Sequence, residues 1–481
     1  MNANYTRMKL VIILGALLWP LGVESATSAD LTKVDSYVSA EMQREHIPGL
    51  AVGIYRRGEI VLAKGYGLAN VELDVPVKAE TIFQSGSVGK QFTATAVMML
   101  VEEGKVRLDD SITKYLERAP ASWAGVQIQN LLSHTSGIAE YETNERTKPG
   151  APFFLRLDYT EEELLDKIAG LPVDFQPGER WRYTNTNYVL LGMLIHKITG
   201  QFYGDFMAQR IFKPLGMTAT RIISDADIIP NRSAGYQREK GELKNQDWVS
   251  PTFNSTADGT MYFNVLDLAK WDAALYTEKL LKKSSLDRMW TVFPLNDGKP
   301  NPAKYGFAWA IDAINGHKVI QHNGAWQGFT THISRYVDDG FTVAVLTNLD
   351  ADHSHPGKIA HAVAGLVEPG LAPPHVTPIA DTEPQLTESL REIVNRIAIG
   401  STVQEAFTTE ARAELFPDRI SVLGTFLKES GPVKSFEVVE RREEGGERIR
   451  RYRMAASDAD VFLTFRLSKD GKIAKLTASL E

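Results

Sequence analysis

The sequence predicts an α+β fold in which helices flank an antiparallel sheet, with an all-helical insert beside the sheet and a small α+β domain at the C-terminal end. Three observations indicate this architecture. Strand patterns occur near residue 50 and again after residue 317, mainly helical sequence lies between them, and a proline-rich segment near residue 370 precedes further strands. Strands from both ends of one domain can share a sheet, so the helical middle is expected to lie beside it.

The chain has 481 residues, no cysteine and a formal net charge of −7. That length allows about two to four domains at roughly 100–200 residues each. Without cysteine there is no disulfide, thiolate metal site or cysteine nucleophile. The chain is mildly acidic and has no long run of basic residues that could bind a phosphate backbone, so nucleic acid is not an expected partner. The expected partner is a small-molecule or peptide substrate.

Residues 1–29 have the order of a secretory signal peptide. Arg7 and Lys9 precede an apolar run over residues 11–23, and small residues follow as far as Ala29. The run is shorter than the roughly 20 residues that span a bilayer. The sequence therefore predicts export, removal of this segment, and a periplasmic or secreted protein with no stable membrane span. An uncleaved membrane anchor is the alternative.

The first elements are a hairpin and a long helix. Residues 49–66 form two apolar runs around the turn Arg56-Arg57-Gly58, which predicts a β-hairpin. After Ser87, apolar residues recur at helical spacing until Gly104. Ser87 is therefore expected at the start of a largely buried helix.

The later elements complete a first domain, which is predicted over residues 30–368. Sequence from about residue 105 to 290 is mostly helical and loop-rich, with a clear helix at YVLLGMLIHKITG. Strands return over residues 318–321, 330–337 and 341–347, where apolar and polar residues alternate. An Asp-Asp-Gly turn joins the last two strands as a hairpin.

A linker and a second domain follow. Four prolines fall between residues 369 and 378, too dense for a helix or an inner strand, and predict a linker over 369–381. Residues 382–481 are predicted to form a small accessory domain. Its first half is helical, and its second half holds the strands SFEVVERR, RIRRYRMAA, VFLTFRLS and KIAKLTAS, separated by glycine-containing turns.

The pattern Ser-x-x-Lys occurs twice, from Ser87 to Lys90 and from Ser111 to Lys114. Ser87 follows an extended stretch and opens the long apolar helix, which places Lys90 one turn further along the same face. Ser111 opens a short amphipathic piece after two aspartates, where a helix cap is its expected role. The first pair is therefore the candidate nucleophile and base, with a helix cap as the alternative for Ser87.

Two further patterns have more than one match. Tyr-x-Asn occurs at residues 183–185, in a tight loop before a helix, and at residues 262–264, where the asparagine can cap the next helix. Lys/His-x-Gly occurs at residues 148–150, 322–324 and 355–357. Proline occupies the middle of the first and last of these and cannot donate within an inner strand. Residues 322–324, which end a predicted strand, are therefore the candidate.

With these choices the chain resembles a known family. The segments that carry the likeness lie in the family's order over about residues 32–365: FQSGSVGKQFTATAVMMLVEEGKVRLDDSITKYL, LLSHTSGI, PGERWRYTNTNYVLLGMLIHKITG and HNGAWQGF. They resemble the serine β-lactamase-like and penicillin-recognising hydrolases, which include class C β-lactamases, D-alanyl-D-alanine carboxypeptidases, D-aminopeptidases and related esterases. The third motif is commonly Lys-Thr-Gly in β-lactamases, whereas His322-Asn323-Gly324 is more like the peptidase and esterase members.

The resemblance implies acyl transfer through a covalent intermediate on Ser87. A serine hydroxyl needs an adjacent base. An unperturbed lysine or tyrosine has a pKa near 10 and needs a drop of about 3 units to serve near pH 7, so this magnitude does not choose between Lys90 and Tyr183. We therefore assign them jointly, with Lys90 activating Ser87 and Tyr183 relaying the proton to the leaving group.

The same likeness implies how substrate is held. The backbone N–H groups of Ser87 and of Ala325, which follows Gly324, would form the oxyanion hole. Asn185 would hold the substrate carbonyl, and His322 would contact its carboxylate or ring. The expected substrates are D-amino-acid peptides or small esters. No cofactor is expected, and the oligomeric state stays open.

Three alternatives remain. The protein would be a β-lactamase, a non-catalytic penicillin-binding-type sensor of the same fold, or a zinc hydrolase. The zinc reading uses polar residues near one loop: Asp350, Asp352, His353, His355 and His361. Because there is no helical His pair of the HExxH kind, the expected role is a solvated loop, and no metal is expected. Aromatic residues near the motifs suggest an aromatic-lined cleft, with a core role as the alternative: Trp181, Tyr188, Trp326 and Phe329.

Overall fold

The computed structural model describes residues 28–351, 353–374, 376–401, 403–416, 418–429, 433–455 and 460–480. The predicted signal segment lies outside these residues except for Ser28 and Ala29, at which α1 (Ser28–Glu45) begins. Asp352 also lies outside them. Among the described residues, no helix combines the length and apolar character that crossing a bilayer requires.

A seven-stranded antiparallel sheet forms the centre of the larger domain, in the order β3-β2-β1-β12-β11-β10-β9. The strands are β1 (Gly49–Arg56), β2 (Glu59–Asn70), β3 (Val75–Pro76), β9 (Ala310–Ile314), β10 (His317–Trp326), β11 (Phe329–Tyr336) and β12 (Phe341–Thr347). Strand β1 pairs directly with β12, which confirms that one sheet is built from both ends of the domain. The predicted β1–β2 and β11–β12 hairpins are also confirmed.

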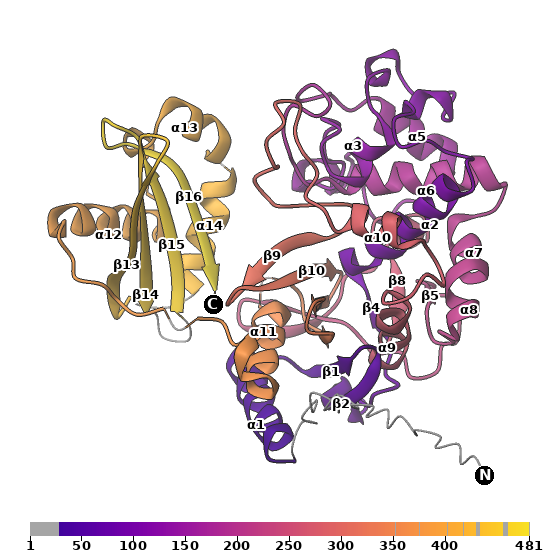
Figure 1. The fold of residues 1–481 in the computed structure, drawn as a ribbon, viewed down its shortest axis with the longest axis horizontal. Helices are drawn as coiled ribbons and strands as arrows, with labels where there is room; N and C mark the ends of the chain where they lie inside the picture. The colour runs from indigo at the N-terminus through magenta and orange to yellow at the C-terminus, as the bar shows by residue number, and fades with distance from the viewer. Residues whose placement is uncertain are drawn as a thin grey trace, which may run out of the picture.

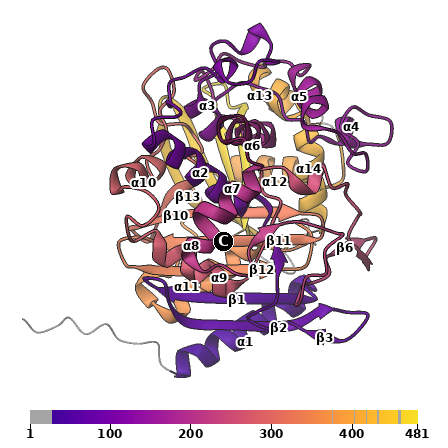
Figure 2. The same cartoon turned by 90° about the vertical axis from the view of Figure 1, so that its right-hand side faces the viewer.

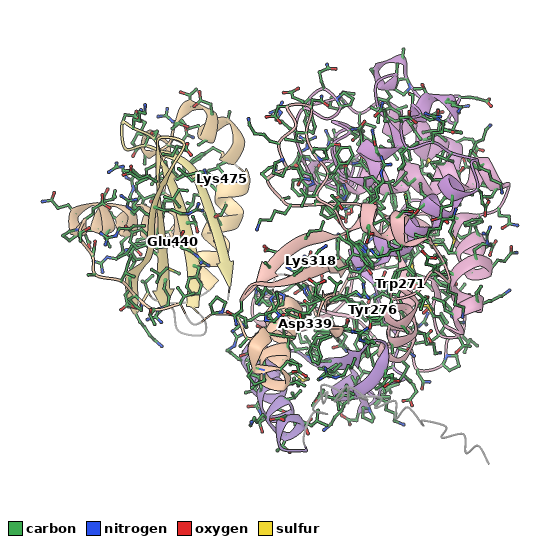
Figure 3. The ribbon with its side chains drawn as sticks, in the orientation of Figure 1. Trp271, Tyr276, Lys318, Asp339, Glu440 and Lys475 are labelled. Carbon is green, nitrogen blue, oxygen red and sulfur yellow. The ribbon has the colours of Figure 1, made fainter. Side chains whose placement is uncertain are left out.

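Helices cover both faces of this sheet because its inner strands are apolar on both sides. In β1, Leu50 and Val52 pack with α1 and α11 (Pro356–Val367), whereas Ala51 and Tyr55 belong to the larger core on the other face. Figure 2 shows α1 on one side of the sheet and the helical part of the domain on the other. Helix α9 (Val265–Ala274) lies on that second face, where its buried Trp271 is labelled in Figure 3.

The segment between β2 and β9 is mainly helical, as predicted, but it also contains short strands. Its remaining helices are α2 (Lys90–Glu102), α3 (Ile128–Leu132), α4 (Asn144–Thr147), α5 (Glu161–Ala169), α6 (Asn185–Thr199), α7 (Tyr203–Met207), α8 (Lys213–Leu215) and α10 (Lys283–Met289). Its strands are β4 (Phe83–Gln84), β5 (Arg221–Ile222), β6 (Tyr236–Glu239), β7 (Glu242–Asn245) and β8 (Met261–Phe263). The insert is therefore not all-helical, because pairing with β8 satisfies the extended backbone of β4 and β5.

A second sheet and three helices form the predicted small C-terminal domain (Figure 1). The helices are α12 (Pro384–Ala398), α13 (Thr409–Leu415) and α14 (Asp418–Glu429), and the sheet has the order β13 (Ser435–Glu444), β14 (Glu447–Ala455), β15 (Asp460–Leu467) and β16 (Ile473–Leu480). This domain has its own apolar core. The fold class is thus confirmed, whereas the exact bounds 30–368, 369–381 and 382–481 stay predictions.

Candidate active site

Ser87 lies in the 3-10 turn Gly86–Gly89, which connects β4 to α2, and is partly exposed between buried neighbours. The turn packs tightly against β10. Gly86 has a φ of +49°, and a methyl group there would lie 2.3 Å from the backbone nitrogen of Ala325. A methyl group at Gly324 would lie 2.9 Å from the backbone nitrogen of Ser87. Glycine at both positions therefore lets the two backbone nitrogens approach one another.

Lys90 begins α2 and is fully buried. Its Nζ lies 2.9 Å from Ser87 Oγ and 2.7 Å from Asn185 Oδ1, and it also contacts the backbone carbonyl of Asp258. These contacts join three segments that are distant in the sequence. They also account for all three hydrogen-bonding positions of the amine.

Tyr183 lies beside this amine, with Lys90 Nζ 5.0 Å from the centre of its ring. Its ring packs on His134 at 4.2 Å between centroids and meets Tyr305 edge-on. The Tyr183 hydroxyl is buried and makes no hydrogen bond. Burial raises the pKa of Tyr183 above its ordinary value, although the nearby Lys90 amine and Ser87 hydroxyl act in the opposite direction. The hydroxyl is therefore protonated at neutral pH.

Asn185 is held by two carboxylates that the sequence analysis did not single out. Its backbone N–H donates to Glu140 at 2.5 Å, and its Nδ2 donates to Glu142 Oε2 at 2.8 Å. The second contact turns the amide oxygen of Asn185 toward Lys90. Burial, followed by the charges of Asp258 and Glu140, raises the pKa of Glu142 to about 8. No local sequence pattern predicts the contact between Glu142 and Asn185, because these residues meet only through the packing of α6.

The third motif lies inside β10, which is longer than the predicted strand. His322 is buried, and its two ring nitrogens contact the Tyr305 hydroxyl at 2.8 Å and the Asn323 carbonyl at 2.5 Å. Burial is the main cause that lowers the pKa of His322 to about 4, so the ring is neutral at pH 7. Because side chains alternate along a strand, Asn323 and Ala325 are the exposed residues of this motif. The contact between the His322 ring and substrate stays a prediction, and in this conformation Asn323 is the more exposed of the two side chains.

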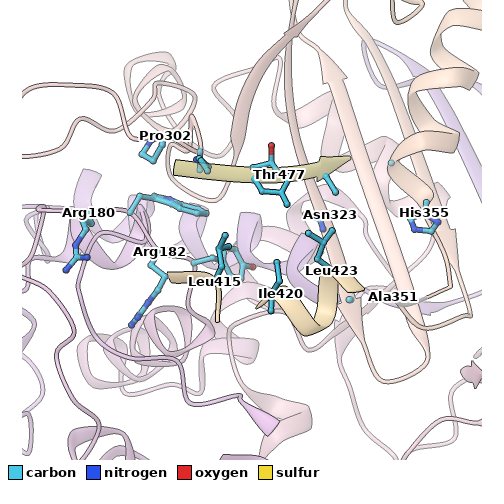
Figure 4. Close-up of a pocket in the computed structure, with 18 of the residues that line it drawn as sticks. Arg180, Arg182, Pro302, Asn323, Ala351, His355, Leu415, Ile420, Leu423 and Thr477 are labelled. Atoms are coloured by element: carbon cyan, nitrogen blue, oxygen red, sulfur yellow. The ribbon is translucent and has the colours of Figure 1, made fainter. Parts of the chain in front are cut away.

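Two pockets meet at this constellation. The first, of about 980 Å³, is lined by Ser87, Glu142 and Asn185 together with the half-exposed Trp248. The second, of about 1750 Å³, extends from Trp181 and Gly324 to the C-terminal domain (Figure 4). Both pockets are lined by Tyr183, Asn323 and Ala325. Ser87 and its neighbours therefore lie where two binding spaces join.

The second matches of each pattern have structural roles. Ser111 caps a short 3-10 turn by accepting from the backbone of Thr113 at 3.3 Å, and Lys114 bonds Asp110 at 2.9 Å. Asn264 caps α9 by accepting from Asp267 at 2.9 Å, as predicted. These contacts separate the decoy motifs from the candidate site.

The remaining Lys/His-x-Gly matches also contribute residues to the pocket walls. Lys148 lines the smaller pocket, and His355 lines the larger one. The proposed zinc ligands each have a different partner: His353 contacts Asp350 at 2.9 Å, His355 contacts Glu45 at 3.3 Å, and His361 contacts Gln321 at 2.7 Å. Within the described part of the chain, no three histidine or carboxylate residues form a group able to hold a metal.

The aromatic residues divide between cleft and core. Trp181 lines the larger pocket. In contrast, Tyr188 and Phe329 are buried in the main core, and Trp326 is buried there with its indole N–H donating to Asn254 at 2.9 Å. The hypothesis of an aromatic-lined cleft therefore holds for Trp181 alone among these four residues.

Comparison with known proteins identifies the family. Residues 34–367 match the family model described as Beta-lactamase. Penicillin-binding protein 4* of Bacillus subtilis (strain 168) is 30% identical over 323 residues, which cover 63% of this chain and 69% of that protein.

Solved structures give the same result. The octameric penicillin-binding protein homologue from Pyrococcus abyssi is 25% identical with a TM-score of 0.62, and the match covers 94% of this chain and 98% of that one. A D-stereospecific amidohydrolase from Streptomyces sp. is 28% identical with a TM-score of 0.58, and the match covers 70% of this chain and 97% of that one. Because the family match contains every residue from Ser87 to Ala325, this chain belongs to the beta-lactamase family.

Proposed function

We propose that this protein is a serine hydrolase that forms an acyl-enzyme on Ser87 and cleaves D-amino-acid peptides, amides or small esters. The observation that carries this proposal is the 2.9 Å distance between Ser87 Oγ and Nζ of the fully buried Lys90. A serine hydroxyl becomes an effective nucleophile when a base within hydrogen-bond reach accepts its proton.

Lys90 acts as that base in its neutral form. A neutral amine has two N–H donors and one lone pair. The Asn185 amide oxygen and the Asp258 carbonyl can accept the two N–H groups, which leaves the lone pair for the Ser87 hydroxyl. As Ser87 attacks the substrate carbonyl, its proton passes to Lys90.

Tyr183 supplies the proton that the leaving group needs. Its raised pKa keeps the hydroxyl protonated, and this hydroxyl has no competing hydrogen-bond partner. When the tetrahedral intermediate collapses, Tyr183 donates its proton to the departing amine or alkoxide. The Lys90 ammonium then returns a proton to Tyr183, so that the charges balance. Between Lys90 and Tyr183, this arrangement favours Lys90 as the base.

The oxyanion is stabilised by the backbone N–H groups of Ser87 and Ala325. The close approach of Gly86 to Ala325 and of Gly324 to Ser87 favours a shared position for one oxygen atom. Each such donor contributes roughly 2.7–4 kcal/mol in other hydrolases. Asn185 is then placed to hold the carbonyl of the acyl portion, with Asn323 in the position first expected for His322.

The Glu142 carboxyl group in the smaller pocket favours substrates with a free amine. Glu142 lines this pocket, and its pKa of about 8 would fall next to a substrate ammonium. The similarity to a D-stereospecific amidohydrolase agrees with D-aminoacyl substrates. A β-lactamase activity is the second candidate, favoured by the family match.

Covalent labelling tests the proposal. A fluorophosphonate or labelled penicillin should modify the wild type at Ser87, and Ser87→Ala should lose the label and at least about 10³-fold in kcat/KM. The matched Ser111→Ala variant should keep both. D-alanine amide, p-nitrophenyl acetate and nitrocefin are then compared, with and without EDTA. An adduct on another residue would contradict the mechanism, and nitrocefin as the best substrate would favour the β-lactamase.

We also propose that the protein is exported, from the basic, apolar and small-residue order of residues 1–29. Expression of the full chain in a Gram-negative host should give a periplasmic protein that lacks this segment. N-terminal sequencing of the mature product measures the cleavage position. Full-length protein in the membrane fraction would instead indicate an uncleaved anchor.

A further inference from the structure

The larger pocket is built from both domains. One wall comes from the C-terminal domain and is mainly apolar, with Leu415, Ile420 and Leu423 on its helices and Leu476 and Ala478 on β16. The facing wall comes from the larger domain and includes Trp181, Arg182 and Pro302. Figure 4 shows Leu415, Ile420 and Leu423 around one space with Asn323 of β10 and Thr477 of β16.

This pocket adjoins the smaller pocket that contains Ser87. It shares Tyr183, Asn323 and Ala325 with the smaller pocket, whereas Ser87, Asn185 and Glu142 line the smaller pocket alone. In the proposed mechanism, Asn185 holds the acyl portion and Tyr183 protonates the leaving group. The smaller pocket is therefore the acyl side, and the larger pocket begins where the leaving group departs.

The size of the larger pocket indicates an extended leaving group. Its volume of about 1750 Å³ exceeds the roughly 300–1,000 Å³ that small-molecule sites occupy. An ammonia, methanol or single-residue leaving group would fill little of it. None of the apolar residues of the C-terminal wall lines the smaller pocket that contains Ser87, so we expect a leaving group of several atoms to contact that wall.

We propose that the C-terminal domain forms the leaving-group subsite, which takes an extended apolar chain against Leu415, Ile420 and Leu423. The enzyme is thereby selective for esters or amides whose leaving group is a long apolar chain or an apolar peptide extension. This inference rests on the proposed function of Ser87, because it assigns a direction to the acyl transfer at that residue.

A series of D-alanine esters with one acyl group and leaving groups of increasing length tests the subsite. Methyl, butyl and octyl esters are compared through kcat/KM, measured as D-alanine released. Alkyl alcohols differ little in intrinsic reactivity, so a trend reports binding of the chain. We expect kcat/KM to rise at least about tenfold from methyl to octyl, because removing even two methylene groups from water is worth about that factor.

Single cysteine variants test whether the alkyl chain of the leaving group binds against the C-terminal domain. The protein has no cysteine of its own, so Thr477→Cys on β16 and Ile399→Cys, 77% exposed in the same domain but outside the pocket, can each be modified selectively. An octyl thiosulfonate on residue 477 should reduce the octyl-to-methyl ratio of kcat/KM about tenfold. The same group on residue 399 should leave that ratio as in the wild type. Leu423→Asp should lower the ratio without any reagent, and Ile399→Asp should not.

The outcomes separate this inference from the proposed function. Equal kcat/KM for all three esters, with normal labelling of Ser87, overturns the leaving-group subsite and leaves the serine hydrolase intact. The role of the C-terminal domain is overturned if the octyl-to-methyl ratio of kcat/KM is unchanged both by modification at residue 477 and by Leu423→Asp. It is also overturned if modification at residue 399 lowers that ratio as much as modification at residue 477. No hydrolysis of any ester together with no label on Ser87 overturns the proposed function itself.

Discussion

At the scale of single residues, the Tyr183 hydroxyl and the Lys90 amine have different surroundings although both are buried near Ser87. Burial raises the pKa of the Tyr183 hydroxyl, and this effect exceeds the opposite effect of the nearby Lys90 amine and Ser87 hydroxyl. The Lys90 amine instead has a hydrogen-bond partner in each of three directions. Tyr183 is thus suited to donate a proton and Lys90 to accept one.

Tyr183→Phe should therefore affect amides more than activated esters. A p-nitrophenolate leaves without a proton, whereas an amine must be protonated, so kcat/KM should fall less than about tenfold for a p-nitrophenyl ester and roughly 10²–10⁴-fold for a D-aminoacyl amide. Steady-state kinetics on both substrates measure the difference. Tyr188→Phe is the control, because its hydroxyl donates to the Leu132 carbonyl in the core. Equal losses on both substrates would remove Tyr183 from the proton transfer.

Glu142→Gln should stabilise the protein at alkaline pH. The pKa of Glu142 is about 8 in the folded protein, against an unfolded value near 4.3, so the folded state holds one more proton between these values. Stability contributed by this group is therefore lost as pH rises from about 4 to 8.

The free energy of unfolding of Glu142→Gln should consequently equal that of the wild type at pH 4 and exceed it by roughly 1–2 kcal/mol at pH 9. This difference is smaller than the full pKa shift implies, because the side chain is partly exposed to solvent. Urea unfolding at both pH values measures this, with the exposed Glu59→Gln as control. The variant should also lose preference for a free amine over an N-acetylated D-alanyl substrate. A wild-type advantage at pH 9 would contradict the raised pKa.

At the scale of elements, the contact between the Ser87 turn and β10 builds the site. The contact depends on Gly86, which has a positive φ and no side chain between the turn and the strand. The sequence places Ser87 and Lys90 on one turn, because residues three apart share a helix face. It does not place β10 beside them, because the two segments are more than 200 residues apart and meet only in the folded sheet.

Gly86→Ala should disrupt this junction. The added methyl group would meet backbone atoms of β10, which cannot move independently, so kcat/KM and Ser87 labelling should fall at least about 10²-fold, as for loss of an oxyanion donor. Gly104→Ala is the matched control: φ is +68° there as well, but nothing lies within 4 Å of the added methyl group. It should cost about 1–2 kcal/mol in stability and retain activity. Equal activity in the two variants would show that the close contact has no role.

At the scale of the whole molecule, buried neutral histidines make the stability of the folded protein depend on pH. Burial lowers the pKa of His322 and of His361 to about 4, and it lowers those of His134 and His332 well below the ordinary value. The unfolded chain protonates near pH 6.5, so it binds more protons than the folded chain between about pH 6.5 and 4. Stability is therefore present above pH 6.5 and is lost as the solution is acidified.

Urea unfolding of the whole protein should measure this loss. The free energy of unfolding should be at least about 3 kcal/mol lower at pH 4.5 than at pH 7, because two such histidines each contribute about 1.4 kcal/mol per unit of pKa shift. His361→Gln should reduce the pH dependence, because one of the buried groups is removed. His196→Gln, on the surface beside Glu161, should leave it unchanged. A stability that is flat between pH 7 and 4.5 would contradict the buried neutral state of these rings.

The sequence alone determined the local features of this protein. The hairpins, the helix after Ser87, the loop before α6 and the C-terminal strands follow from periodicity and turn residues, which act over a few neighbouring positions. The choice of Ser87 over Ser111 also came from local context. The strands β4, β5 and β8 were not predicted, because their pairing partners lie far away in the sequence. Strand β9 and the β6–β7 hairpin were also missed although their partners are adjacent, because these strands are short and show no alternation of apolar and polar residues.

Only the tertiary structure decided how these pieces act together. It brought Asp258, 168 residues from Lys90, to the amine, and Glu142 to Asn185. It turned His322 into the protein and Asn323 into the cleft, and it set the C-terminal domain opposite Trp181 across the larger pocket. The physical reason is that burial, pKa and the shape of a pocket depend on every segment packed around a group, whereas a sequence pattern reports only the nearest ones.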